Sequence, residues 1–374
     1  MKLKILGYVY QNLIRKILFL FDPEFVHNTI TCIGKLIGST KPGQQITKTI
    51  FFYKSNKLAQ DISGIHFANP IGLSAGFDKD ANLVNILPFV GFGFMTVGTV
   101  TFQPYEGNPK PRLYRLKKSQ ALVVNYGLKN IGVNKIVQRL KNYNKPEDFI
   151  LGISVGKTNC PETAETERGA EDYLNCLKIL NDNNIGDFYE INISCPNTFG
   201  GEPFTTTDKL DLLLSRLTTS LVSKPIFLKM PINIAWEDFK QLLDVAIKYN
   251  INGVTIGNLN KDRKDTDIKD TIPENIKGNI SGKPTFRLSN DLISQTYKYS
   301  GDRLKIIGVG GVFSPEDAYE KIKLGASLVG LITGMIYNGP QLIGQINEDL
   351  EKELNKNNFT SLSQAIGSEL HFIA

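Results

Sequence analysis

Eight short apolar segments, each followed by a stretch of helical periodicity, constrain the fold of this chain more than any other feature of its sequence. The segments are rich in β-branched and aromatic residues and lie at residues 65–73, 92–97, 149–155, 188–193, 225–229, 253–257, 305–309 and 327–332. The helical stretches lie at residues 80–89, 133–142, 171–180, 207–221, 236–249, 286–299, 315–324 and 339–354. Eight alternating units of this size predict a (β/α)8 TIM barrel, an α/β fold whose active site lies on the loops after the strands.

The N-terminal end of the chain is expected to form a separate element. Residues 3–21 are mostly apolar, and Asp22 followed by Pro23 is a typical start for a second helix. No uncharged apolar run here reaches the ~18 to 20 residues that cross a bilayer, and no small-residue cleavage site follows. We therefore predict an amphipathic helical hairpin over residues 1–40 and a barrel domain over residues 41–374.

Positive charge is concentrated at the same end of the chain. A polar linker is expected near residues 41–48, between this end and the barrel. The net charge is +6, and residues 1–50 carry seven basic residues against two acidic ones, a net +5. This asymmetry argues against a nucleic-acid surface on the main body and favours a separate partner for the basic end. Two roles remain open for the hairpin: it lies on a membrane surface, or it packs on the protein's own core or on a second subunit.

Small and polar residues follow the predicted strands. In chain order they are Ala75, Gly76 and Lys79; Thr99; Asn192, Cys195 and Asn197; Lys229; Asn258; Gly310 and Gly311; and Thr333 and Gly334. Open backbone amides after the seventh and eighth strands are typical of a phosphate site in such barrels. The sequence therefore predicts a phosphate-bearing ligand at the mouth of the barrel, where an inward-pointing Lys229 suits an anionic reduced flavin.

Cys195 stands where the fourth strand becomes a loop. The carboxyamides of Asn192 and Asn197 flank it and suit a planar ligand with amide or imide edges. The alternative is that Cys195 is a small buried hydrophobic residue, the commoner fate of an unpaired cysteine. The four cysteines form no CxxC pair, so neither a disulfide framework nor a metal site is predicted. The three histidines lie far from these motifs, which argues against a Cys-His mechanism.

The same motifs resemble the dihydroorotate dehydrogenase family along nearly the whole chain. The resemblance rests on residues 72–80, 98–101, 192–198 and 307–311, which read GLSAGFDKD, GTVT, NISCPNT and IGVGG. The run Asp-Pro-Glu at residues 22–24 and the C-terminal run Tyr-Asn-Gly-Pro at 337–340 resemble the membrane-associated, quinone-dependent class 2 type.

The resemblance implies FMN-dependent oxidation of dihydroorotate to orotate in de novo pyrimidine (UMP) biosynthesis. Cys195 would take the C5 proton as general base, hydride would pass from C6 to flavin N5, and a quinone would receive the electrons. The substrate-binding residues implied are Lys79, Asn125, Asn192, Asn197 and Asn258. The cofactor-binding residues implied are Ala75, Gly76, Lys79, Thr99, Asn192, Lys229, Ser281, Gly282, Gly310, Gly311, Thr333 and Gly334. A peripheral protein on the cytoplasmic side of the cell membrane is also implied.

Five residues mark departures from the family pattern. Cys195 is typical of the soluble class, whereas the quinone class usually has a serine there; a thiol with a pKa near ~8.5 is the easier base. Val124 stands where a substrate-binding asparagine is usual, with Asn125 one position late. Ser154 and Gly257 replace an asparagine and a threonine of the family pattern.

Other functions remain open at this point. A dihydroorotate dehydrogenase that uses fumarate or another soluble acceptor would need the same barrel mouth. A tRNA dihydrouridine synthase is also an FMN barrel with a catalytic cysteine, but that family resembles two-domain proteins with a C-terminal helical module. Only about forty residues follow the eighth predicted strand here, too few for such a module. A non-redox aldolase or isomerase barrel would need a Schiff-base lysine arrangement that the sequence does not indicate.

Overall fold

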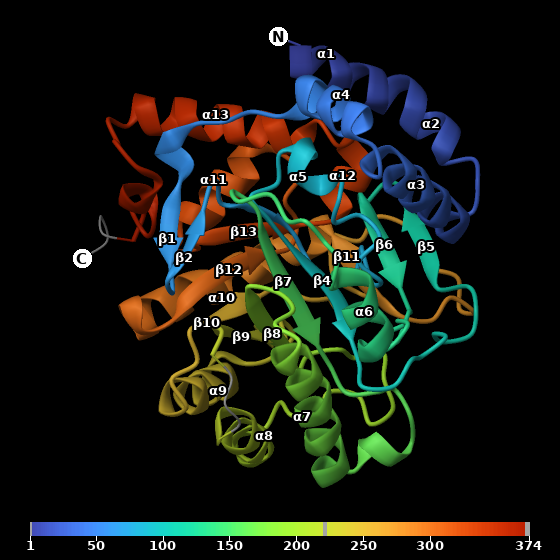
Figure 1. Cartoon of the computed structure of the whole chain (residues 1–374), viewed down its shortest axis with the longest axis vertical. Coiled ribbons are helices and arrows are strands. Elements are labelled where there is room, and N and C mark those ends of the chain that lie inside the picture. Colours follow the sequence, from blue (N-terminus) through green and yellow to red (C-terminus); the bar gives the residue numbers. More distant parts are fainter. Residues whose placement is uncertain (1, 220–222, 371–374) are drawn as a thin grey trace.

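Eight parallel strands close into a barrel in the computed structural model, which describes residues 2–219 and 223–370 (Figure 1). The strands are β3 (Ile71–Leu73), β4 (Phe94–Val100), β7 (Ile150–Val155), β8 (Phe188–Asn192), β9 (Ile226–Met230), β10 (Gly253–Ile256), β12 (Lys305–Val309) and β13 (Leu328–Leu331). Each strand pairs in parallel with the next, and β13 pairs with β3 to close the ring. The predicted TIM barrel is confirmed.

The first predicted strand, residues 65–73, is divided in the structure. Ile71–Leu73 is the barrel strand β3, whereas β2 (Ile65–Phe67) pairs antiparallel with β1 (Gln60–Ile62) outside the barrel. The break falls at Asn69-Pro70, because the Asn69 side chain accepts a hydrogen bond from the backbone N–H of Ile71 and proline cannot donate to a sheet.

Apolar side chains close the end of the barrel at which the strands begin. Residues from the β1–β2 hairpin pack there against residues near the starts of the barrel strands, and the cluster comprises Ile62, Phe67, Phe94, Ile150, Phe188, Phe227, Ile307 and Leu328. The rings of Phe67 and Phe94 meet edge to face at 5.7 Å. Polar residues of the barrel can therefore gather only at the opposite end, where the strands finish.

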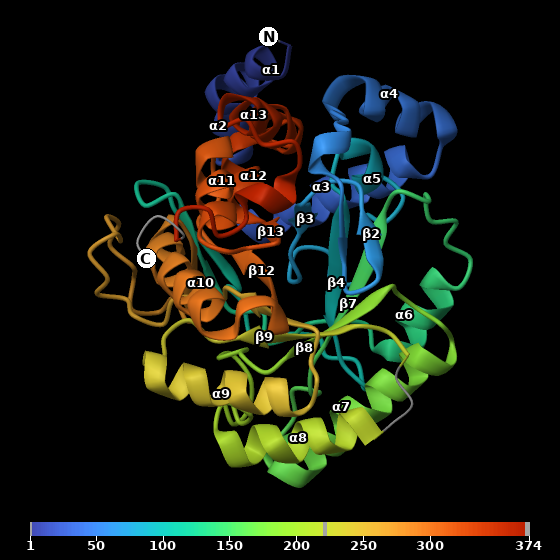
Figure 2. The same cartoon turned by 90° about the vertical axis from the view of Figure 1, so that its left-hand side faces the viewer.

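Helices surround the barrel (Figures 1 and 2). They are α6 (Val133–Leu140), α7 (Thr166–Asp182), α8 (Thr207–Thr219), α9 (Trp236–Lys248), α10 (Phe286–Ser300), α11 (Pro315–Lys323), α12 (Thr333–Asn338) and α13 (Leu342–Lys356). The helix predicted over residues 80–89 is wrong for most of its length, since only α5 (Leu87–Val90) is helical. The Asp78 carboxylate accepts the backbone N–H groups of Asn82 and Leu83 and holds this segment as a loop. The last two residues of the helix predicted over 207–221 lie outside the described residues.

The N-terminal part is mostly helical. It contains α1 (Lys2–Val9), a π-helical turn, α2 (Arg15–Leu18), α3 (Pro23–Gly38) and α4 (Lys41–Phe51). The Asp22 side chain accepts the backbone N–H of Phe25 at 2.8 Å and caps α3, as its sequence predicts. The prediction of a polar linker near residues 41–48 is wrong, because Thr40 caps a further helix there.

These N-terminal helices gather at one end of the molecule beside α13, as both views show. A three-stranded antiparallel sheet, in the order β11 (Asn279–Gly282), β6 (Ala121–Val124) and β5 (Leu113–Leu116), lies next to α3 and was not predicted. The Glu24 carboxylate of α3 forms a buried ion pair with Arg112, just before β5, at 3.2 Å. Among the described helices, none combines the length and the apolar character needed to cross a bilayer.

Candidate active site

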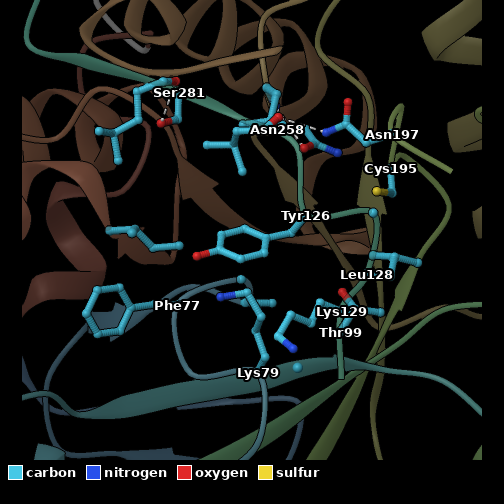
Figure 3. Close-up of a pocket in the computed structure, with 18 of the residues that line it drawn as sticks. Phe77, Lys79, Thr99, Tyr126, Leu128, Lys129, Cys195, Asn197, Asn258 and Ser281 are labelled. Atoms are coloured by element: carbon cyan, nitrogen blue, oxygen red, sulfur yellow. Dashed lines mark hydrogen bonds between the residues drawn. The ribbon is translucent and has the colours of Figure 1, made fainter. Parts of the chain in front are cut away.

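A cavity of about 180 Å³ lies at the carboxyl ends of the barrel strands (Figure 3). Most of the predicted site residues line it: Ala75, Gly76, Lys79, Thr99, Asn192, Cys195, Asn197, Lys229, Asn258, Ser281 and Thr333. An adjoining hollow of about 100 Å³ is lined by several of the same residues and by Gly282, Gly310, Gly311 and Gly334. The structure therefore brings together residues that are spread over more than two thirds of the chain.

Asn125 is the predicted site residue that the structure does not bring into the cavity. Its side-chain oxygen accepts a hydrogen bond from the amide group of Asn108 at 3.0 Å. Side chains alternate across an extended chain, so Val124 and Tyr126 line the cavity and Asn125, between them, faces the other way. The Asn125 side chain therefore lies outside the cavity, between two residues that line it.

Cys195 is half-buried on the loop that follows β8. Burial raises the pKa of its thiol to about 11, while the backbone N–H of Asn197 and the ammonium groups of Lys229 and Lys157 act in the opposite direction. Lys157 follows β7, is buried, and donates to the carbonyl oxygen of Phe199 at 2.7 Å, which ties down the loop that carries the thiol. The resting protein therefore holds a neutral thiol beside two cations.

Three asparagines surround the thiol with oriented amide groups. The Asn192 amide donates to Thr99 Oγ1 at 2.8 Å. The Asn258 amide donates to Ser194 Oγ at 2.6 Å and also contacts its carbonyl oxygen. The Asn197 amide donates to the carbonyl oxygen of Val124 at 3.0 Å. The oxygens of the same three side chains accept hydrogen bonds from protein donors, so both ends of each amide group are held and its orientation is fixed.

Ser154 and Asn279 support this arrangement from outside the cavity. Ser154 Oγ lies 3.0 Å from Thr99 Oγ1, the atom that accepts the hydrogen bond from Asn192. Ser154, which stands where the family pattern has an asparagine, therefore contacts the residue that holds Asn192. The Asn279 amide donates to Asn197 Oδ1 at 2.9 Å, and Asn279 is the register partner of Val124 across the β11–β6 pair. Asn279 therefore lies opposite Val124, the position at which the family resemblance leads one to expect an asparagine.

Two lysines supply positive charge at the cavity. Lys229 Nζ lies 3.9 Å from Glu190 Oε1, and Thr255 donates to the other oxygen of that buried carboxylate. Lys79 Nζ lies 3.8 Å from the centroid of the Tyr126 ring, and Figure 3 shows the amine directed at that ring. Burial lowers the pKa of Lys79 to about 8, against the attraction of Asp80, Asp78 and Glu24.

One arm of the cavity is apolar and was not predicted. Its walls come from α3, the loop after β3, the β5–β6 pair with the chain that follows it, and the start of α12; they comprise His27, Phe77, Leu113, Leu122, Tyr126, Ile332 and Ile336. His27 meets the Phe77 ring edge to face at 4.9 Å, and burial lowers the pKa of His27 to about 3, so its imidazole is neutral. The Tyr126 hydroxyl is buried without a hydrogen-bond partner among the described residues.

The glycine turns at the second hollow leave no room for side chains. A Cβ atom on Gly310 would lie 2.7 Å from Thr285 Oγ1, and one on Gly334 would lie 1.9 Å from the carbonyl oxygen of Val312. Both contacts are shorter than real Cβ atoms allow, so the backbone itself forms the wall. A wall made of backbone rather than side chains suits a phosphate group, the ligand that the sequence predicts for this end of the barrel.

Comparisons with known proteins agree over nearly the whole chain. A family described as "Dihydroorotate dehydrogenase" matches residues 57–354. A protein of Christiangramia forsetii named "Dihydroorotate dehydrogenase (quinone)" is 38% identical over 92% of this chain and 100% of its own, and a protein of Trichodesmium erythraeum with the same name is 33% identical over 96% and 98%. The solved structure of ligand-free DHODH from Eimeria tenella has a TM-score of 0.83 at 26% identity and covers 93% of this chain and 99% of its own.

Proposed function

This chain belongs to the dihydroorotate dehydrogenase family, and from that premise we propose which of its residues bind and transform the substrate. It oxidises dihydroorotate to orotate in pyrimidine biosynthesis and passes the electrons to a quinone. Relatives named for the quinone reaction match it almost from end to end. That likeness favours a quinone over a soluble acceptor and argues against a tRNA dihydrouridine synthase.

The cofactor of this proposal is FMN, which Ala75, Gly76 and Thr99 at the barrel mouth would hold. When bound, FMN supplies the acceptor for the hydride that leaves C6 and the route by which the electrons reach the quinone. The glycine turns that would crowd any side chain support a phosphate position at Gly310, Gly311, Thr333 and Gly334, with Ser281 and Gly282 beside it. The buried ammonium of Lys229 supports a position for the pyrimidine edge of the flavin, where negative charge develops.

Cys195 is the general base. The observation that carries this assignment is that its thiol shares one cavity with Lys79, Asn192 and Asn258, all of which suit the carboxylate and amide edges of dihydroorotate. The thiolate takes the C5 proton, forming an S–H bond, while the C5 electron pair becomes part of the new double bond and the hydride leaves C6. Lys229 and Lys157 favour the thiolate form, because a nearby cation stabilises an anion.

Anaerobic mixing with dihydroorotate tests the assignment. Wild-type protein should lose its oxidised flavin absorbance, and Cys195→Ala should bind the same amount of flavin but reduce it at least ~100-fold more slowly. Purified protein that holds no flavin would refute the cofactor. Normal reduction by Cys195→Ala would remove the thiol from the mechanism.

The apolar arm of the cavity is the quinone site, and the N-terminal helices are the membrane-facing element. Fourteen of the fifteen large, exposed apolar side chains in the described chain lie between Ile5 and Ile46, and Leu20 is 81% exposed. Basic residues accompany them in the same segment. An apolar surface edged by cations fits a peripheral position on an anionic membrane, which we place on the cytoplasmic side.

A further inference from the structure

Lys321 on α11 is a fully buried cation away from the cavity. Its Nζ donates to Ser289 Oγ at 2.6 Å and to Asn290 Oδ1 at 2.7 Å, both on α10, and it lies 5.0 Å from the centroid of the Phe286 ring. No carboxylate in the described parts of the chain lies within 4.0 Å of this ammonium. The Asn290 side chain that accepts from it donates in turn to Glu320 Oε1 at 3.0 Å.

The residues that hold Lys321 also support the glycine turn after β12. A Cβ atom on Gly310 would lie 3.2 Å from Ser289 Oγ, and one on Gly311 would lie 2.4 Å from the Cβ of Phe286. The stem of Lys321 itself packs under the strand, 3.3 Å from where a Cβ of Gly308 would stand. Lys321 therefore lies directly behind the turn whose other face lines the hollow.

A buried ammonium without an ion partner costs free energy. Burial accordingly lowers the pKa of Lys321 to about 7, against the more distant attraction of Asp317 and Glu320. An anion on the far side of the glycine turn would supply the missing charge across a short, poorly hydrated path. Because such coupling is reciprocal, an ammonium that is stabilised by the anion also stabilises the anion.

We propose that Lys321 is a positioning residue for the cofactor phosphate: it supplies positive charge beneath the Gly310–Gly311 turn and gives the site its preference for FMN over unphosphorylated riboflavin. This inference rests on the proposed flavin cofactor. Lys321 touches the turn only through Ser289 and Phe286, so its contribution is charge and support rather than direct contact.

Competition between two flavins tests the charge directly. Holoenzyme is dialysed to equilibrium against equal concentrations of FMN and riboflavin, and the ratio of the two bound flavins is measured after denaturation. Lys321→Met keeps the apolar stem and removes the charge, so the bound FMN:riboflavin ratio should fall about tenfold. Lys323→Met, two residues along α11, removes a partly exposed lysine paired with Glu369 and should leave the ratio unchanged.

The ratio separates charge from packing, because loss of support alone weakens both flavins equally. An unchanged ratio in Lys321→Met would overturn the inference. If that variant does not fold, Asn290→Asp keeps the lysine and places a carboxylate beside it, which should also lower the ratio; an unchanged ratio there would overturn the inference equally. Wild-type protein that binds neither flavin would refute the cofactor itself, a different result from a variant that keeps its selectivity.

Discussion

Raising the pH should accelerate flavin reduction, because the proposed base rests as a neutral thiol. With the pKa of Cys195 raised to about 11 by burial, about one thiol in a thousand is ionised at pH 8. The thiolate fraction grows about tenfold for each pH unit below that pKa. The rate of flavin reduction at saturating dihydroorotate should therefore rise by roughly 100-fold between pH 7 and pH 9 without reaching a plateau.

Stopped-flow absorbance under anaerobic conditions measures this step apart from reoxidation by the quinone. Cys195→Ser should be slower at every pH and should show no plateau either, since a hydroxyl ionises less readily than a thiol. Cys160→Ser is the matched control, because Cys160 is a half-buried free thiol that does not line the cavity, and its profile should follow the wild type. A wild-type rate that is flat from pH 6 to pH 9 would refute the reasoning that the thiol must first lose a proton.

Three further outcomes follow from the structure. Burial lowers the pKa of Lys79 to about 8, so its positive charge is present below pH 8 and is lost above it. The KM for dihydroorotate should therefore rise above pH 8, and a constant KM would exclude Lys79 as the partner of the substrate carboxylate. Glu24→Gln leaves the half-buried Arg112 without a carboxylate partner and should lower the free energy of unfolding by about 3 kcal/mol in urea denaturation; an unchanged value would mean that the pair does not stabilise the docking of α3. Leu20→Glu should reduce cosedimentation with anionic vesicles several-fold, whereas Phe199→Glu, an exposed apolar position outside the N-terminal helices, should not; equal binding by all three proteins would contradict the membrane assignment.

The barrel could be predicted because its strands are buried on both faces and are therefore almost continuously apolar. Strands such as β8 and β12 stand out for that reason, and their bounds differ little from the expected ones. The antiparallel strands β5, β6 and β11 have four residues each; β5 and β11 are partly exposed, and β6 is buried and apolar but too short to be told from an apolar loop segment. The false helix over residues 80–89 shows that a local side-chain contact, here from Asp78, overrides an apolar pattern.

Positions at strand ends could be predicted to converge because barrel geometry places every such loop at one end. Asn125 could not be placed, since its orientation depends on the register of an unpredicted strand. The apolar arm depends on His27 and Tyr126, which come from separate elements and carry no shared spacing. Lys321 left one signal: it lies three residues after Ala318 on the buried face of α11, where a charge interrupts an otherwise apolar helical stripe.

The apolar cluster that closes one end of the barrel limits how the substrate and the quinone can enter. Since the β1–β2 hairpin blocks one end, a water-soluble acid and a lipid-soluble oxidant must both arrive from the other. With the apolar arm beside α3 as the proposed quinone site, the polar part of the cavity with its asparagines and this apolar arm give two separate routes into one cavity. On the proposed assignment, orotate leaves by the route through which dihydroorotate entered, and the quinone reaches the cavity from the side of the N-terminal helices.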